Sequence, residues 1–294
     1  MEKKLKPGVQ AAIGWTSFVL ALYAASAAYH RMEYSGIVQP VQRVVQALIV
    51  VGIVVPTVRV LCRRGAGEFP LRFRGGAWKR EIGAGLFAAG IACALAAAGF
   101  GAAHSLGWIV VEEVRFTGPL LSAMAFNLLI ALLYEALPEE LVFRGLIPDA
   151  LGRRMRSAAV FLLAPILFVL APLAARGLQA ATGMDTQAVT ADYMVLLLFF
   201  AVALQFVRSA LGSLGGSIGF HLAYLMLARF AVLAEPGEGL VRYVEVERET
   251  GSLFVLFLTV VVGGASVFAA LAGLRRRSAR KRKSRALPRT DRSG

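Results

Sequence analysis

The sequence predicts an all-α membrane protein, a polytopic bundle of about eight transmembrane helices with both termini in the cytoplasm. The first observation is composition: 57% of the 294 residues are hydrophobic and 17% are charged, whereas a soluble domain carries about 25% charged residues. The second is the distribution of the charges, which gather in short segments between apolar stretches. The third is the length of those stretches, close to the ~20 residues that span a bilayer.

The apolar stretches define the individual helices. We expect them at 9–29, 38–61, 82–108, 119–150, 157–175, 191–210, 214–234 and 252–273. The first follows a lysine-rich start and also has features of a signal peptide, with Ala25-Ser26-Ala27 resembling a cleavage site. We expect this segment to be retained, because the later spans count better with it in place. Pro138 is expected to kink the fourth helix.

The distribution of lysine and arginine predicts the orientation. With both termini in the cytoplasm, the inner side receives the basic segments 3–6, 59–80, 153–156, Arg208 and 275–292. The outer side then receives the acidic segments 112–113, Asp185 and 235–249. This arrangement obeys the positive-inside rule. We therefore expect a multi-pass protein of the cell's inner (plasma) membrane.

The same charges bear on domains and partners. Residues 1–274 form the predicted transmembrane domain, and 275–294 form a basic, apolar-poor tail expected to be disordered and to contact anionic lipid. The net charge of +14 does not indicate nucleic acid, since the basic residues lie in loops and a tail between apolar spans. Cys62 and Cys93 match no metal or redox spacing. We expect the lipid bilayer as the surrounding partner.

A cluster of ionisable residues interrupts the fourth apolar stretch. Glu135, Glu139, Glu140 and Arg144 fall within ten residues, although each such group costs about 2.5–3.5 kcal/mol at the centre of a membrane helix. Glu140 and Arg144 are spaced i, i+4, so they share a helix face and can neutralise each other. Glu139 points roughly 100° away. We therefore expect one carboxylate in a structural ion pair and the other free for chemistry.

One histidine is placed to meet Glu139. With the orientation above, Glu139 lies about fourteen residues before Arg153, and His221 lies about thirteen residues after Arg208. At 1.5 Å per residue these distances place both side chains at similar depth in the cytoplasmic half of the bilayer. A carboxylate and an imidazole that meet inside a bundle can act as a general base, orient a water molecule and stabilise an oxyanion. Such a site needs no metal.

Two motifs carry a family resemblance. They are Glu-Glu-x-x-x-Arg-Gly at 139–145 and Gly-Ser-Ile-Gly-Phe-His at 216–221. Between about residues 120 and 230 the chain resembles the CAAX protease and bacteriocin-processing (CPBP) family, helical intramembrane proteases of the glutamic type related to the Rce1 CAAX endopeptidases. The resemblance implies an endopeptidase that cuts a peptide bond near the membrane in a membrane-anchored or lipidated peptide or protein.

The resemblance also implies roles for individual residues. Glu139 would be the general base that activates water, and Glu140 and Arg144 would hold it in place. His221 would assist at the water or at the oxyanion. The resemblance implies no cofactor and no metal ligand.

The chain departs from the family pattern at two positions. The second motif, Phe-x-x-x-His, corresponds to 168–172 and has Pro172 in place of histidine; the third, His-x-x-x-Asn, has Leu225 in place of asparagine. Loss of one oxyanion donor costs about 10²–10³ in rate. Glu135, one turn before Glu139, is a further departure and is placed to share a proton with it. The polar residues considered as substitutes are Gln205, Tyr224, Ser209 and Asn127.

Other interpretations remain open at this point. A degenerate family member would bind a peptide or partner without cutting it, and the two departures favour this alternative. A transporter or channel would use the buried charges as an ion relay, but no internal repeat is evident. The glutamate–arginine cluster also fits a purely structural ion-pair network, and His221 fits a core histidine. Glu139, Glu140 and His221 also suggest a zinc site, although catalytic zinc usually takes three ligands with histidine prominent.

Overall fold

The computed structural model describes residues 4–65, 67–71, 76–186, 188–234, 239–246 and 251–286, with side chains to residue 279. Within these ranges eight helices are long and apolar enough to cross a membrane. They are α1 (Pro7–Tyr34), α2 (Gln39–Arg64), α3 (Ala77–Ser105), the span Gly118–Gly152, α7 (Ser157–Ala181), α8 (Ala191–Leu211), the span Leu214–Val232 that begins with α9 (Leu214–Leu227), and the span from Ser252 onward. The predicted all-α multi-pass fold is confirmed.

The fourth span, which carries the glutamates, is not a uniform α-helix. It runs through α4 (Gly118–Ala131), the π-helical segment η1 (Leu132–Ala136), α5 (Leu137–Glu140), a second π-helical segment η2 (Leu141–Leu146) and α6 (Ile147–Gly152). Pro138 has no N–H to donate to the preceding turn. The expected disturbance at Pro138 therefore takes the form of widened turns on both sides of it, and π-helical turns are frequent at functional sites.

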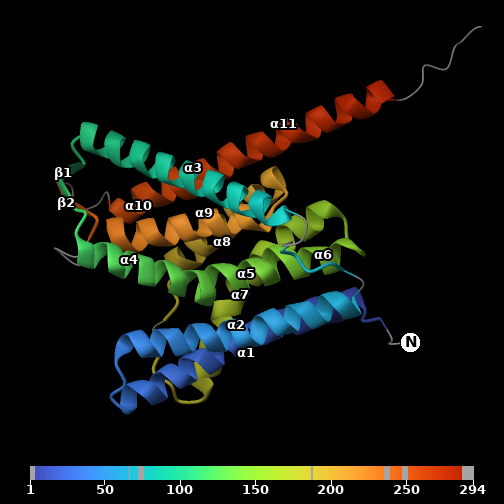
Figure 1. Cartoon of the computed structure of the whole chain (residues 1–294), viewed down its shortest axis with the longest axis horizontal. Coiled ribbons are helices and arrows are strands. Elements are labelled where there is room, and N and C mark those ends of the chain that lie inside the picture. Colours follow the sequence, from blue (N-terminus) through green and yellow to red (C-terminus); the bar gives the residue numbers. More distant parts are fainter. Residues whose placement is uncertain are drawn as a thin grey trace, which may run out of the picture.

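Two hydrophobic cores lie on either side of this span. One joins α1, α2, η2, α6 and α7, and includes Phe18, Phe143 and Phe168. The other joins α3, α8, α9 and the last span, and includes Phe200 and Phe220. Figure 1 shows α1 and α2 along one side of the molecule and α3 with α11 along the other, with α4, α5 and α6 between them. The charged segment of the fourth span therefore lies where the two cores meet.

Glycines bring α3 and α9 into close contact. A Cβ atom on Gly219 would clash with the backbone of Gly85, and one on Gly215 would clash with the backbone of Glu81. Small residues that let backbones approach are typical of helix contacts in membranes. The Glu81 carboxylate also accepts hydrogen bonds from Ser213 Oγ (2.6 Å) and the Gly215 amide (2.7 Å). This packing fixes the height of α9, and therefore of His221.

A two-stranded antiparallel ribbon, which was not predicted from the sequence, lies at one end of the bundle. β1 (Ile109–Val114) pairs with β2 (Val241–Glu245), with a register shift between Val111 and Glu113. The third helix was expected to reach residue 108, but α3 ends at Ser105. Strands this short are well below the length of a membrane span, so a pattern of long apolar stretches does not reveal them.

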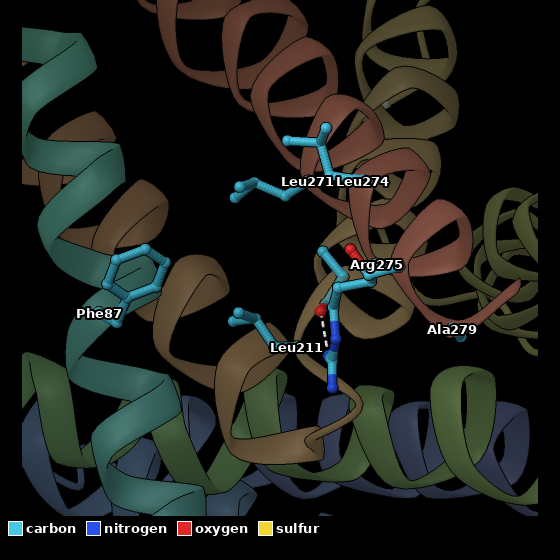
Figure 2. Close-up of a pocket in the computed structure, with 8 residues that line it drawn as sticks. Phe87, Leu211, Leu271, Leu274, Arg275 and Ala279 are labelled. Atoms are coloured by element: carbon cyan, nitrogen blue, oxygen red, sulfur yellow. Dashed lines mark hydrogen bonds between the residues drawn. The ribbon is translucent and has the colours of Figure 1, made fainter. Parts of the chain in front are cut away.

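The start of the first helix and the end of the last one lie at the end of the bundle opposite to the ribbon, on different sides of it (Figure 1). Figure 1 shows the start of α1 and the far end of α11 (Gly263–Ala286) away from the ribbon. Residues 275–286 are helical here, unlike the disordered tail that the composition predicts, and 287–294 lie outside the described residues. Arg275 donates a hydrogen bond to the Ala210 carbonyl at the end of α8, which ties α11 to α8 beside an apolar groove (Figure 2).

Candidate active site

The predicted ion pair between Glu140 and Arg144 is present and buried. Arg144 Nη1 lies 3.2 Å from Glu140 Oε1, and the two side chains are 2% and 0% exposed. Arg144 Nη2 also donates to the Ala201 carbonyl of α8 at 3.3 Å, and the guanidinium carbon lies 4.5 Å from the centre of the Phe168 ring of α7. The pair therefore holds the fourth span against both α7 and α8.

His221 lies against both glutamates, whereas the depth argument placed it beside Glu139 only. Its Nδ1 is 3.3 Å from Glu140 Oε1, and its Nε2 is 3.9 Å from Glu139 Oε2. The imidazole is 3% exposed and makes an edge-to-face contact with the Phe200 ring, whose centroid is 4.9 Å away. If Nδ1–H donates to Glu140, the ring is oriented with Nε2 towards Glu139.

Glu139 differs from Glu140 in its surroundings. Its side chain is 18% exposed and lines a cavity of about 140 Å³ enclosed by α1, the fourth span, α7, α8 and α9. His221, Tyr193 and Tyr224 line the same cavity, and its other walls are mainly leucine and phenylalanine side chains. This volume exceeds the ~30 Å³ that one water molecule occupies in the liquid. The carboxylate that is not engaged by Arg144 thus faces the open space.

The two positions that depart from the family motifs face this same cavity. Pro172 of α7 and Leu225 of α9 both line it, together with Glu139 and His221. Residues from three separate segments, each corresponding to one family motif, thus line one cavity. The apolar side chains of Pro172 and Leu225 supply neither a proton donor nor an acceptor there.

Of the polar substitutes considered from sequence, one lies at the site. Tyr224 lines the cavity, whereas Asn127 lines a different one. Gln205 and Ser209 are not among the residues that line either cavity, and Ser209 Oγ donates to the Gln205 carbonyl. Tyr193 lines the Glu139 cavity but was not proposed from sequence, because a tyrosine near a helix end normally indicates an interface anchor.

Glu135 has a charged partner of its own. Arg229 Nη2 lies 2.5 Å from Glu135 Oε1, and the two side chains are 32% and 23% exposed. Glu135 also lines the cavity that contains Glu139, as its position one turn earlier predicts. The sequence predicts only a proton shared between the two carboxylates, and the ion pair with Arg229 was not predicted.

The described residues hold no group of three or more His, Cys, Asp or Glu side chains arranged to bind a metal ion. Glu139 and His221 are placed to act on a water molecule. A water placed between Glu139 Oε2 and His221 Nε2, which are 3.9 Å apart, can lie at a normal hydrogen-bond distance of about 2.8 Å from both. The site thus combines a proton acceptor, a second polar atom and space for the reacting group.

Comparison with protein families agrees with the geometry. Residues 121–227 match the family described as "Type II CAAX prenyl endopeptidase Rce1-like". The matched region includes all four clustered residues, the substituted positions Pro172 and Leu225, and all of α9. Comparisons with curated proteins and with solved structures gave no match. The chain is therefore a multi-pass membrane protein that contains an Rce1-like CAAX prenyl endopeptidase (CPBP) domain at residues 121–227.

Proposed function

We propose that this protein is an intramembrane endopeptidase of the glutamic type that hydrolyses a peptide bond near the membrane in a membrane-anchored or lipidated substrate. The observation that carries the proposal is the arrangement of Glu139 and His221, 3.9 Å apart in one cavity. Glu140, the neighbouring carboxylate, is held by Arg144 and is not exposed to that cavity. The match to a protease family supports the same activity.

In the proposed reaction Glu139 is the general base. It takes a proton from the water as the water oxygen attacks the carbonyl carbon of the peptide bond, which produces a tetrahedral intermediate with a negatively charged oxygen. The C–N bond then breaks, and the proton on Glu139 passes to the departing amine nitrogen. His221 Nε2 holds the water beside Glu139 or, when it carries a proton, donates to the oxyanion. Each step is balanced without a metal or cofactor.

Glu140 and Arg144 act as positioning residues in this scheme. Glu140 Oε1 contacts both Arg144 and the Nδ1 atom of His221. The carboxylate therefore orients the imidazole, as the buried carboxylate of a catalytic triad does for its histidine. Arg144 fixes Glu140 through the ion pair and anchors it to α8.

Binding without cleavage is the second candidate function. The observation that favours it is the presence of Pro172 and Leu225 in the cavity wall, where the family motifs have histidine and asparagine. A site without those groups has fewer donors for the oxyanion. Such a protein would hold a peptide or partner segment in the same cavity and leave it uncut.

Glu139→Gln distinguishes the two functions. The change keeps the shape of the side chain but removes the proton acceptor, and loss of a general base costs about 10²–10⁴ in rate. We expect a deletion strain carrying Glu139→Gln to accumulate the uncut membrane substrate, while the variant protein is present at normal level. Glu113→Gln, at the exposed ribbon, is the matched control and should restore processing. Full processing with Glu139→Gln at normal abundance would rule out the protease.

A further inference from the structure

A second, polar cavity lies next to the one that contains Glu139. It has a volume of about 470 Å³ and lies between α2, α4, η1 and the π-helical segment η3 (Ala228–Val232). Its charged and amide side chains are Arg43, Gln46, Asn127, Glu135 and Arg229. A polar cavity of this size among membrane helices offers solvation that the hydrocarbon of the bilayer does not, so water and polar peptide groups are stable in it.

We call this second cavity the outer cavity. It lies in the half of the molecule that contains the β1–β2 ribbon. Arg43 lies in the first turns of α2, just after the connection from α1, and that connection is at the ribbon end of the bundle (Figure 1). Arg229 lies in the last turn of the seventh span, where the chain leaves the bundle on its way to β2. The outer cavity therefore faces the side of the membrane opposite to the start of α1 and the far end of α11.

The ion pair between Glu135 and Arg229 separates the two cavities. Glu135 lines both of them, whereas Arg229 lines only the outer one. Each partner belongs to a π-helical segment, Glu135 to η1 and Arg229 to η3. The side chains of Arg229 and Glu135 remain 32% and 23% exposed, so the pair is not sealed inside the protein and is less firmly held than a fully buried one.

We propose that the Glu135–Arg229 pair is the gate through which water and the polar part of a substrate reach Glu139 from the ribbon side of the membrane. This inference rests on the proposed function for its purpose, but the route itself is a property of the two cavities. In the closed state Arg229 holds Glu135 between the cavities. When the pair parts, the outer cavity and the Glu139 cavity become continuous.

Cysteine accessibility tests the route without an activity assay. Cys62 and Cys93 are replaced by alanine, and Leu225→Cys supplies one thiol inside the Glu139 cavity. Membrane vesicles of each orientation are treated with membrane-impermeant methanethiosulfonate reagents. Val244→Cys, on the exposed ribbon strand, is the marker that identifies the ribbon side. We expect Leu225→Cys to react only from the side on which Val244→Cys reacts.

Opening the gate should accelerate this reaction. A minor open state is populated at about 0.1–10%, so Arg229→Ala has room to raise the rate at Leu225→Cys by about tenfold. Arg229→Lys, which keeps the charge, should give an intermediate rate. Arg242→Ala breaks the exposed ion pair with Glu112 on the ribbon and should leave the rate unchanged.

Two controls separate gating from other effects. Cationic and anionic reagents should both react faster in Arg229→Ala, because an electrostatic effect of the lost charge would move the two rates in opposite directions. A parallel Arg229→Ala protein that keeps the buried Cys62 as its only thiol should stay unreactive, because reaction there reports unfolding. If Arg229→Ala exposes Cys62, Arg229→Lys becomes the deciding variant.

The labelling results decide whether the route and the gate exist, and they do not depend on whether the protein is a protease. Reaction of Leu225→Cys from the side opposite to the ribbon would overturn the route, and rates unchanged in both folded Arg229 variants would overturn the gate. If Arg229→Ala raises the reaction rate of one reagent and lowers that of the oppositely charged one, the gate is contradicted. Full processing by Glu139→Gln would overturn the proposed protease and leave the labelling results as they stand.

Discussion

Nδ1 of His221 lies 3.3 Å from Oε1 of Glu140, the same carboxylate oxygen that Arg144 contacts at 3.2 Å. Two ionisable groups, one from the fourth span and one from α9, therefore converge on one buried oxygen atom. The other oxygen of Glu140, Oε2, has no hydrogen-bond partner in the part of the chain that the structure describes. The buried charge of this carboxylate thus depends on Arg144 through Oε1, and its neighbour Glu139 is the carboxylate that faces the cavity.

This dependence predicts how the fold responds to loss of Arg144. Arg144→Ala leaves Glu140 as a buried, uncompensated charge, which costs about 3–5 kcal/mol. We expect a strong fall in the amount of folded protein recovered from membranes, measured by size-exclusion chromatography in detergent. Arg144→Lys keeps the charge but loses the planar contact with Phe168 and should lower the yield less.

Arg242→Ala is the control for Arg144→Ala. It removes an exposed ion-pair partner on the ribbon, and exposed pairs contribute about 0–1 kcal/mol, so the yield should be close to that of the parent. Normal yield of Arg144→Ala with loss of activity alone would contradict the structural role and assign the arginine to catalysis.

Glu139 and His221 should act as one unit. If both serve the same water molecule, either Glu139→Gln or His221→Ala removes most of the rate, and the double variant adds little to the larger single loss. The measurement is the rate of substrate processing in membranes for the two single variants and the double variant, at matched protein levels. Losses that multiply in the double variant would show that the two side chains act independently.

Restoring the family pattern should not harm a working protease. Pro172 and Leu225 line the cavity, so Pro172→His with Leu225→Asn places an imidazole and an amide beside Glu139. We expect the rate of processing to rise or stay unchanged, since added donors can stabilise the oxyanion. Leu225→Met, which keeps an apolar side chain of similar volume, is the packing control and should leave the rate near that of the parent.

The close contact between α3 and α9 predicts a stability difference between two glycines. Gly219→Ala places a methyl group against the backbone of Gly85, which has no flexible side chain to move aside. Overpacking of this kind costs about 1–3 kcal/mol. We expect a lower thermal unfolding temperature in detergent and reduced activity, because His221 lies in the same helix.

Gly90→Ala is the matched substitution for Gly219→Ala. It lies in α3, and a Cβ atom there meets no described atom within 4 Å. Alanine is about 0.5–1 kcal/mol more favourable than glycine inside a helix, so the unfolding temperature should rise slightly or stay unchanged. Equal effects of the two substitutions would show that helix propensity, rather than the α3–α9 contact, decides the outcome.

The helices and the centre of the site were predicted from local sequence patterns and from the position of residues along the membrane normal. Span length gave the eight helices, and i, i+4 spacing gave the pair of Glu140 with Arg144. Depth along the membrane normal gave the meeting of His221 with Glu139. A membrane restricts helices to one common direction, so residue counts alone place side chains at comparable heights.

The features that were not predicted depend on how the helices pack side by side. No periodic pattern in the sequence predicts that packing. Tyr193 and the partner of Glu135, Arg229, were missed because both lie near helix ends, where interface anchoring is the usual interpretation. The β1–β2 pairing joins segments from distant parts of the chain and has no signal in either one alone. The wide turns around Pro138 were expected only as a kink.

The orientation of the protein in its membrane is the last prediction. The last span begins with α10 (Ser252–Leu256), which lies at the ribbon end of the bundle (Figure 1). The excess of lysine and arginine at the opposite end predicts that the ribbon side faces away from the cytoplasm. A dual reporter fused after Gly251 should therefore read outside, and one fused after Gly273 should read inside. Equal signals from the two fusions would contradict the eight-span arrangement, and exchanged signals would invert the orientation and place the route to Glu139 on the cytoplasmic face.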